Sequence, residues 1–207
     1  MGFLATLFSC GQGTNLTNKE IGLCEIAGIN QRLAQSIKEL TKKPLQLIPE
    51  INELGEVLDT KDEGLCSPTD EKNSYEHVFK LKEKFKSEGV LVFAFEDTKH
   101  QKFLAAIKGS DELDIIKWRQ TNGINYGYEN EDLLVKLKEW KSKNDFFVLG
   151  VGTDFIEFEF ATMPSNMEAF AKDVYQFCPD IVDQGAGDLE TLRNEMIRMH
   201  GVYLWWD

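Results

Sequence analysis

The chain has 207 residues, of which 42% are hydrophobic. This length and apolar content are enough to bury one good-sized core, which excludes a largely disordered chain. The formal net charge is −12, and residues 150–207 carry 11 acidic and 3 basic side chains, a net of −8 that leaves −4 for the rest. Nucleic acid is an unfavourable partner, because binding to it depends on basic contacts to phosphate. The acidic end favours a basic protein partner or a cation, or it is a solvated acidic surface.

Residues 1–16 are interpreted as a leader or linker. Leu7-Phe8-Ser9-Cys10 resembles a lipobox, which makes Cys10 the anchor of a membrane lipoprotein if the natural start lies upstream. The pattern Met1-Gly2-x-x-x-Thr6 also fits myristoylation, and a third interpretation is an apolar segment that packs on the protein. No stretch approaches the roughly 20 apolar residues of a membrane span. The sequence leaves the location open between the cytoplasm and a membrane that is reached through Cys10 if the natural start lies upstream.

Residues 17–70 predict a small, mostly helical N-terminal region. Thr17-Asn18-Lys19-Glu20 has the form of a capping box, and apolar residues follow at helical spacing as far as Leu40. Glycines within this segment favour two short helices over one. Residues 44–48 predict a strand that Pro49 ends. Residues 54–70 are rich in Asp, Glu, Gly, Thr and Pro, so they predict a loop and a boundary to the main domain.

The main domain, residues 71–207, begins with a helix and a strongly apolar strand. Ser74 is expected to cap a helix that runs to about residue 87. Val90–Phe95 is a continuous apolar run, which predicts a central strand covered on both faces. Phe103–Ile107 predicts a neighbouring strand. The connection between the two is too short for a helical crossover, so the pair should be antiparallel.

A second hairpin is predicted from residues 146–149 and 155–160, with a glycine-rich loop between them. Its second strand alternates strictly, so that the carboxylates of Glu157 and Glu159 share one face with Phe155. That face, or the edge of the sheet beside it, is expected to be wet and acidic.

The last part of the chain predicts two helices and a strand. Residues 165–168 form a capping box pattern before an amphipathic helix, which Pro179 should end at or before Cys178. Asp188 can cap the next helix, and residues 202–206 predict the final strand. The whole pattern indicates an α+β fold, with helices packed on one face of a largely antiparallel mixed sheet.

The run Tyr175–Gly185 and the terminal Trp205-Trp206-Asp207 combine several rare residues in a fixed order. Together with Met163-Pro164 and the segment Leu133–Val148, they resemble the DUF4253 family, a bacterial domain of unknown function. The resemblance is strong from about residue 132 to the end. It implies that three short segments belong to one motif set, namely Cys178-Pro179-Asp180, Asp183-Gln184-Gly185 and Trp205-Trp206-Asp207. It implies no reaction.

Three carboxylates of this motif set form the first candidate site. If the last strand ends near residues 178–185, the side chains of Asp180, Asp183 and Asp207 converge. They would then bind a hard cation such as Ca²⁺ or Mg²⁺, or act as a general acid and base. The alternative is that Asp180 and Asp183 accept hydrogen bonds from backbone N–H groups and fix the loop. Cys178 is interpreted as buried packing, because the end of a helix and acidic neighbours oppose a thiolate.

Two aromatic features complete the candidate surface. On a strand, the rings of Trp205 and Trp206 point to opposite faces, so one can be exposed as a binding hot spot while the other is buried, unless helices cover both. Asn125 and Tyr126 lie on a turn-rich loop that either holds a polar ligand or is purely structural. The candidate ligand- or partner-binding residues are Asn125, Tyr126, Asp180, Asp183, Gln184, Trp205, Trp206 and Asp207. The sequence assigns no catalytic residue, metal ligand or cofactor.

Three functional hypotheses follow. The first is a non-catalytic interaction protein that binds a basic partner through its acidic C-terminal surface, with an immunity-type inhibitor of a toxin as one version. The second is a metal-binding or hydrolytic domain that uses Asp180, Asp183 and Asp207. The third is an envelope lipoprotein anchored at Cys10. The absence of nucleophile and nucleotide-binding motifs favours the first.

Overall fold

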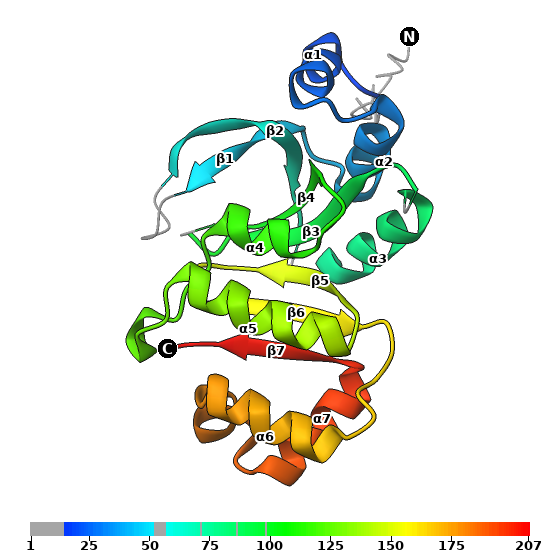
Figure 1. The fold of residues 1–207 in the computed structure, drawn as a ribbon. Helices are drawn as coiled ribbons and strands as arrows, with labels where there is room; N and C mark the ends of the chain where they lie inside the picture. The colour runs from blue at the N-terminus through cyan, green and yellow to red at the C-terminus, as the bar shows by residue number, and fades with distance from the viewer. Residues whose placement is uncertain (1–14, 52–56, 71, 86, 98) are drawn as a thin grey trace, which may run out of the picture.

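The computed structural model describes residues 15–51, 57–70, 72–85, 87–97 and 99–207. These residues form one mixed sheet of seven strands in the order β1-β2-β4-β3-β5-β6-β7 (Figure 1). All neighbouring strands are antiparallel except β3 and β5, which are parallel. The strands are β1 (Gln46–Ile51), β2 (Val57–Pro68), β3 (Val90–Glu96), β4 (Lys102–Lys108), β5 (Phe146–Val151), β6 (Phe155–Phe160) and β7 (Gly201–Trp205).

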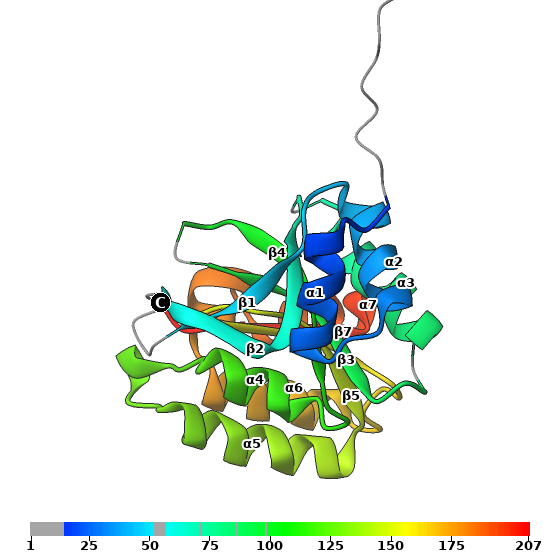
Figure 2. The same cartoon turned by 90° about the horizontal axis from the view of Figure 1, so that it is seen from above.

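Helices cover both faces of the sheet (Figure 2). One face packs against α1 (Asn18–Ala27), α2 (Gln31–Thr41) and α3 (Ser74–Phe85), and the other against α4 (Leu113–Arg119), α5 (Asn130–Lys143) and α6 (Met167–Phe177). The α+β fold, its largely antiparallel mixed sheet and its helical N-terminal region are confirmed. The expectation that helices lie on one face is wrong, because the central strands are apolar on both faces and each face must be covered.

Strand β3 lies in the centre of the sheet and contributes to two apolar cores. Phe93 and Phe95 are buried in the core beneath α4, α5 and α6, where both rings contact Trp118. Val92 and Ala94 are buried in the core beneath α1, α2 and α3. The prediction of a central strand covered on both faces is confirmed, and so is its antiparallel pairing with β4.

Two predictions about the N-terminal region are wrong. Residues 54–70 are not a loop, because residues 57–68 form β2. Residues 64–68 pair with β4, and Leu65 and Cys66 among them also pair with β1. Among the described residues, those between 57 and 61 pair with β1 alone. A two-stranded ribbon that extends beyond the sheet does not need the alternation of apolar and polar residues found in a half-buried strand. The polar sequence of β2 therefore resembles that of a loop. Pro49 does not end β1, since β1 is an edge strand, where proline is tolerated.

The two short N-terminal helices are confirmed, and Gly28 ends the first with a φ of 60°. Thr17 and Glu20 form the predicted capping box. Buried Glu20 also accepts hydrogen bonds from the Lys38 ammonium and from Leu45 N. Burial alone would raise the pKa of Glu20, but these hydrogen bonds outweigh it and lower the pKa to about 2. This carboxylate therefore joins α1, α2 and the start of β1.

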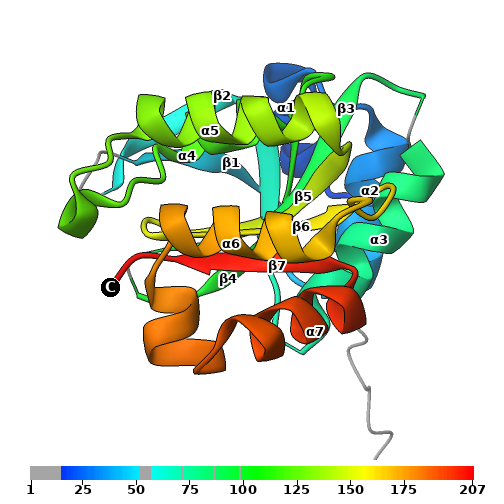
Figure 3. The same ribbon diagram turned by 60° about the horizontal axis from the view of Figure 1, so that its bottom comes forward.

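The C-terminal elements follow the prediction closely. The β5–β6 hairpin, the end of α6 before Pro179 and the strand β7 are all confirmed. The cap of α6 lies one residue later than expected, because Asn166 accepts the hydrogen bond from Ala169 N. Between α6 and α7 (Leu189–Met199), the chain forms an unpredicted π-helix, η2 (Ile181–Ala186). Figure 3 shows η2 and α7 beside the edge strand β7.

Cys10 and the lipobox-like sequence lie outside the described residues, so the lipid-anchor interpretation stays a prediction. In the part of the chain that the structure describes, no helix combines the length and apolarity that crossing a membrane requires.

Candidate functional site

The end of α6 and the C-terminal strand are joined by direct hydrogen bonds. The Cys178 thiol donates to the carbonyl oxygen of Trp205 at 2.9 Å. The indole Nε1 of Trp206 donates to the carbonyl oxygen of Phe177 at 3.2 Å. The backbone N–H of Asp207 donates to Oδ2 of Asp180 at 2.9 Å. Segments almost 30 positions apart in the chain therefore form one physical unit.

Asp180 is the centre of this unit and is only 2% exposed. Its Oδ1 accepts hydrogen bonds from the hydroxyl of Tyr126 at 2.6 Å and from Nε2 of Gln184 at 2.7 Å. Burial would raise its pKa, but these bonds and the one from Asp207 N outweigh burial and hold the pKa below its usual value. Tyr126 responds in the opposite direction, since donating to Asp180 raises its pKa to about 12. The cluster of Tyr126, Asp180, Gln184 and Asp207 is called the Asp180 cluster below.

The remaining predicted polar residues do not join this cluster directly. Asp183 is exposed and accepts a hydrogen bond from the Tyr175 hydroxyl at 2.9 Å. Asn125 is exposed on the short 3-10 helix η1 (Ile124–Tyr126). Across the described ranges, no group of three or more His, Cys, Asp or Glu side chains is placed to hold a metal ion. The hydrogen bonds of the Asp180 cluster thus join segments of the chain to one another, which is typical of a structural role.

Trp205 and Trp206 are neighbours in the chain but differ in burial. Trp206 is buried, its ring lies edge-on to Phe177 with centroids 5.5 Å apart, and a side chain at Gly123 would collide with it. Trp205 is half-buried, and its ring covers Gly185 so closely that a Cβ there would lie 2.6 Å from Cη2. Trp206 is therefore a core residue, while Trp205 presents part of its surface.

Trp205 lines a groove of about 440 Å³ between β7, η2 and α7, here named the β7 groove. Its walls are mainly apolar, with charged side chains from Glu195 and Arg198. Met199 is 41% exposed, so apolar surface reaches the mouth of the groove. The lining residues are Ile181, Gly185, Ala186, Leu192, Glu195, Met196, Arg198, Met199, Gly201, Val202, Tyr203 and Trp205.

An aromatic row continues from the groove onto the neighbouring strand. The rings of Tyr203 and Trp205 lie 5.6 Å apart, and Phe155 stacks on Tyr203 at 5.5 Å. Glu157 pairs in register with Tyr203, and Glu159 pairs with Gly201, so both glutamates lie beside the row. Burial raises the pKa of each carboxyl. The two glutamates and Phe155 share one face, as the alternation of β6 predicts. The face is less wet than expected, because Phe155 is buried and both glutamates are partly buried.

Sequence reasoning missed the contribution of α7 to this surface. Leu192, Met196 and Met199 share the apolar stripe of α7, which on its own indicates only a helix packed on a core. The signal that distinguishes the groove is the exposure of Met199 at one end of that stripe, whereas Leu192 and Met196 are only 2% exposed. Exposure of this kind follows from tertiary packing.

The family model described as "Domain of unknown function (DUF4253)" matches residues 103–207. The match covers half of the chain, so the chain belongs to this family. No curated protein and no solved structure matches the chain. The Asp180 cluster and the lining of the β7 groove lie entirely within the matched residues.

Proposed function

We propose that this member of the DUF4253 family is a non-catalytic interaction protein, and that it binds a basic protein partner through the β7 groove. The observation that carries the proposal is the groove itself, where Trp205 and Tyr203 lie beside Met199 in a concave, partly exposed surface. Aromatic residues and Met are enriched in protein interfaces, and Trp and Tyr are among the residues enriched at interface hot spots. Methionine side chains also adapt readily to the shape of a partner.

The charges around the groove indicate the sign of the charge that a partner should carry. Glu195 lines the groove, and Glu157 and Glu159 lie beside its aromatic row, whereas Arg198 is the basic residue in the lining. Residues 150–207 as a whole carry a net charge of −8. A segment that inserts an apolar side chain and flanks it with Lys or Arg would match this surface. An immunity-type inhibitor facing a basic toxin is one such pairing.

The chemistry of the motif residues supports a non-catalytic role. Burial is the main cause that raises the pKa of the Cys178 thiol to about 12, so it is a poor nucleophile at neutral pH. Asp180 uses both carboxylate oxygens for hydrogen bonds within the chain. A metal-binding or hydrolytic domain has less support, because Asp183 accepts a hydrogen bond from Tyr175 and no group of three such side chains is placed for a metal ion among the described residues.

The test is a pull-down from the source cell at low and moderate salt, with the captured protein identified and its affinity then measured with purified components. Trp205→Ala should abolish capture, because it removes the proposed hot spot. Glu195→Lys should weaken binding more at low than at moderate salt, since salt screens exposed charges. Glu131→Lys is the matched control, because it makes the same charge change on an exposed residue of α5. Recovery of no partner at either salt, or equal capture by Trp205→Ala, would refute the proposal.

A further inference from the structure

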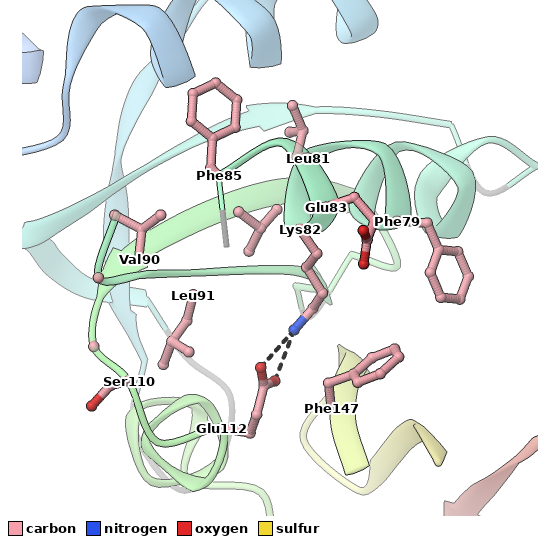
Figure 4. Close-up of a pocket in the computed structure, with 13 residues that line it drawn as sticks. Phe79, Leu81, Lys82, Glu83, Phe85, Val90, Leu91, Ser110, Glu112 and Phe147 are labelled. Carbon is pink, nitrogen blue, oxygen red and sulfur yellow. Dashed lines mark hydrogen bonds and ion pairs between the residues drawn. The ribbon is translucent and has the colours of Figure 1, made fainter. Parts of the chain in front are cut away.

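A second cavity lies at the end of the sheet where β3 begins and β4 ends (Figure 4). It has a volume of about 230 Å³ and is enclosed by α3, the ends of these two strands and the start of β5. It shares no lining residue with the β7 groove. We name it the α3 pocket. A ligand in the α3 pocket would therefore not compete with the proposed protein partner for the same residues.

The walls of the α3 pocket are mostly apolar. Phe79 from α3 and Phe147 from β5 meet edge to face with ring centroids 6.4 Å apart. Leu91 and Phe85 are buried parts of the same lining. A pocket of this kind suits the apolar body of a small molecule.

One ion pair lies within these apolar walls. The Lys82 ammonium donates to both carboxylate oxygens of Glu112, at 2.9 and 2.8 Å, and the two side chains are only 15% and 18% exposed. Glu112 also accepts a hydrogen bond from Val148 N at 2.8 Å. Burial lowers the pKa of Lys82. Since burying two charges is costly, a hydrophobic pair would serve packing at least as well.

Both charged side chains line the pocket, where the Lys82 ammonium also lies 5.5 Å from the centroid of the Phe147 ring, and the pair retains hydrogen-bonding capacity. An ammonium has three N–H groups, and within the described residues Lys82 uses two of them on Glu112. Oε1 of Glu112 accepts from Lys82 alone among the described residues, which leaves a lone pair on that oxygen. Figure 4 shows both charged groups between Leu91 and Phe147.

We propose that the α3 pocket binds a small neutral molecule with an aromatic or compact aliphatic body and one amide or hydroxyl group. Such a group both accepts and donates, so it satisfies Lys82 and Glu112 together while the apolar body fills the space beside Phe79 and Phe147. An anionic group would be repelled by Glu112 and by Glu83 at the rim. A cationic group would be repelled by Lys82.

Three probes of the same shape test this selectivity, namely benzamide, benzoate and benzamidine. Each is titrated into the ¹⁵N-labelled full chain, and amide chemical shifts are followed by NMR. Benzamide is expected to shift the amides of Phe79, Val90, Leu91 and Phe147, with a dissociation constant in the millimolar range for so small a ligand. Benzoate and benzamidine should bind at least several-fold more weakly. Absence of shifts up to the solubility limit, equal binding of all three, or shifts centred on Trp205 would overturn the proposal.

A variant pair separates pocket binding from unspecific adsorption. Val90→Phe enlarges a half-buried residue of the lining and should abolish the benzamide shifts. Val135→Phe makes the same substitution at a site that is 71% exposed on α5 and should leave them unchanged. Equal benzamide binding by both variants would contradict the assigned site. The wild-type probe series decides the question on its own if Val90→Phe fails to fold.

Discussion

The Asp180 cluster and the β7 groove each contain residues of the motif set, yet they differ in exposure and in the partners of their side chains. The cluster is closed, since Asp180 is 2% exposed and its partners come from within the chain. The groove is open, and Trp205 and Met199 keep accessible surface there. Adjacent residues, Trp206 and Trp205, belong to the core and to the groove respectively. A rare motif can therefore be mainly internal while Trp205 contributes exposed surface to the groove of the proposed interface.

The largest expected effect comes from comparing the two substitutions Trp206→Ala and Trp205→Ala. Removing the buried Trp206 ring should lower the free energy of unfolding by about 3–5 kcal/mol, because it leaves a cavity against Phe177 and Gly123. Removing the half-buried Trp205 ring should cost about 1 kcal/mol. Urea unfolding followed by circular dichroism measures both values. Equal losses would show that Trp205 is also a core residue and would remove the main support for the groove.

Much of this fold could be predicted from the sequence, because the apolar pattern of a segment often matches the burial that the segment has in the fold. The apolar run at β3 predicts a strand covered on both faces, and the structure has two cores there. The polar sequence of β2 gives no such signal, because among the described residues those between 57 and 61 pair with β1 and with no second strand. Strand identity there comes from pairing, which a single sequence does not reveal.

The arrangement of the candidate residues could be predicted only in part. The sequence treated Tyr126 and the carboxylates of Asp180 and Asp207 as separate features, and the structure joins the three by hydrogen bonds. It also placed Asp183 among the convergent carboxylates, but the turn of the π-helix η2 directs it to Tyr175 instead. A π-helix has no sequence signature comparable to a capping box, so the direction of side chains on η2 could not be derived.

The second test compares the two aspartates of this loop. Asp180→Asn should lower the free energy of unfolding by about 1–3 kcal/mol, because an amide group cannot accept all three hydrogen bonds that the carboxylate receives. Asp183→Asn, on an exposed residue with one partner, should change it by less than about 0.5 kcal/mol. Thermal and urea unfolding at neutral pH measure both. If Asp180→Asn left the free energy of unfolding unchanged, the cluster would not stabilise the fold, and a binding role for it would have to be considered again.

The third test places a methyl group between the two regions. Gly185→Ala puts a Cβ 2.6 Å from Cη2 of Trp205, so the ring must move away from η2. The expected loss is about 1–3 kcal/mol, with weakened partner capture because the groove changes shape. Gly22→Ala serves as control, since a Cβ at that position would have no neighbouring atom within 4 Å and alanine favours the interior of α1. Partner capture that is unaffected by Gly185→Ala would place the interface elsewhere.

The smallest expected effect is the pH dependence, and it has opposite signs in the two regions. The hydrogen bonds of Asp180 lower its pKa, so its stabilising contribution is present above the ordinary carboxyl pKa and is lost as the pH falls through the lowered value. Burial raises the pKa of Glu157, so the unfavourable contribution of its charge appears as the pH rises through that raised value. Glu157→Gln should therefore raise stability at neutral pH by about 0.5 kcal/mol and have less effect in acid.

The opposite effects of the two carboxyl groups on stability can be measured from unfolding curves between acidic and neutral pH. The curves are recorded for wild type, Glu157→Gln and Asp180→Asn. The Asp180→Asn variant should lose the acid-side decline that its carboxylate causes, whereas Glu157→Gln should keep that decline and gain stability only towards neutral pH. If Glu157→Gln instead loses stability at neutral pH, its charge is favourable where it lies, beside the aromatic row. The acidic surface would then be explained by internal pairing, and the proposed basic partner would lose its electrostatic support.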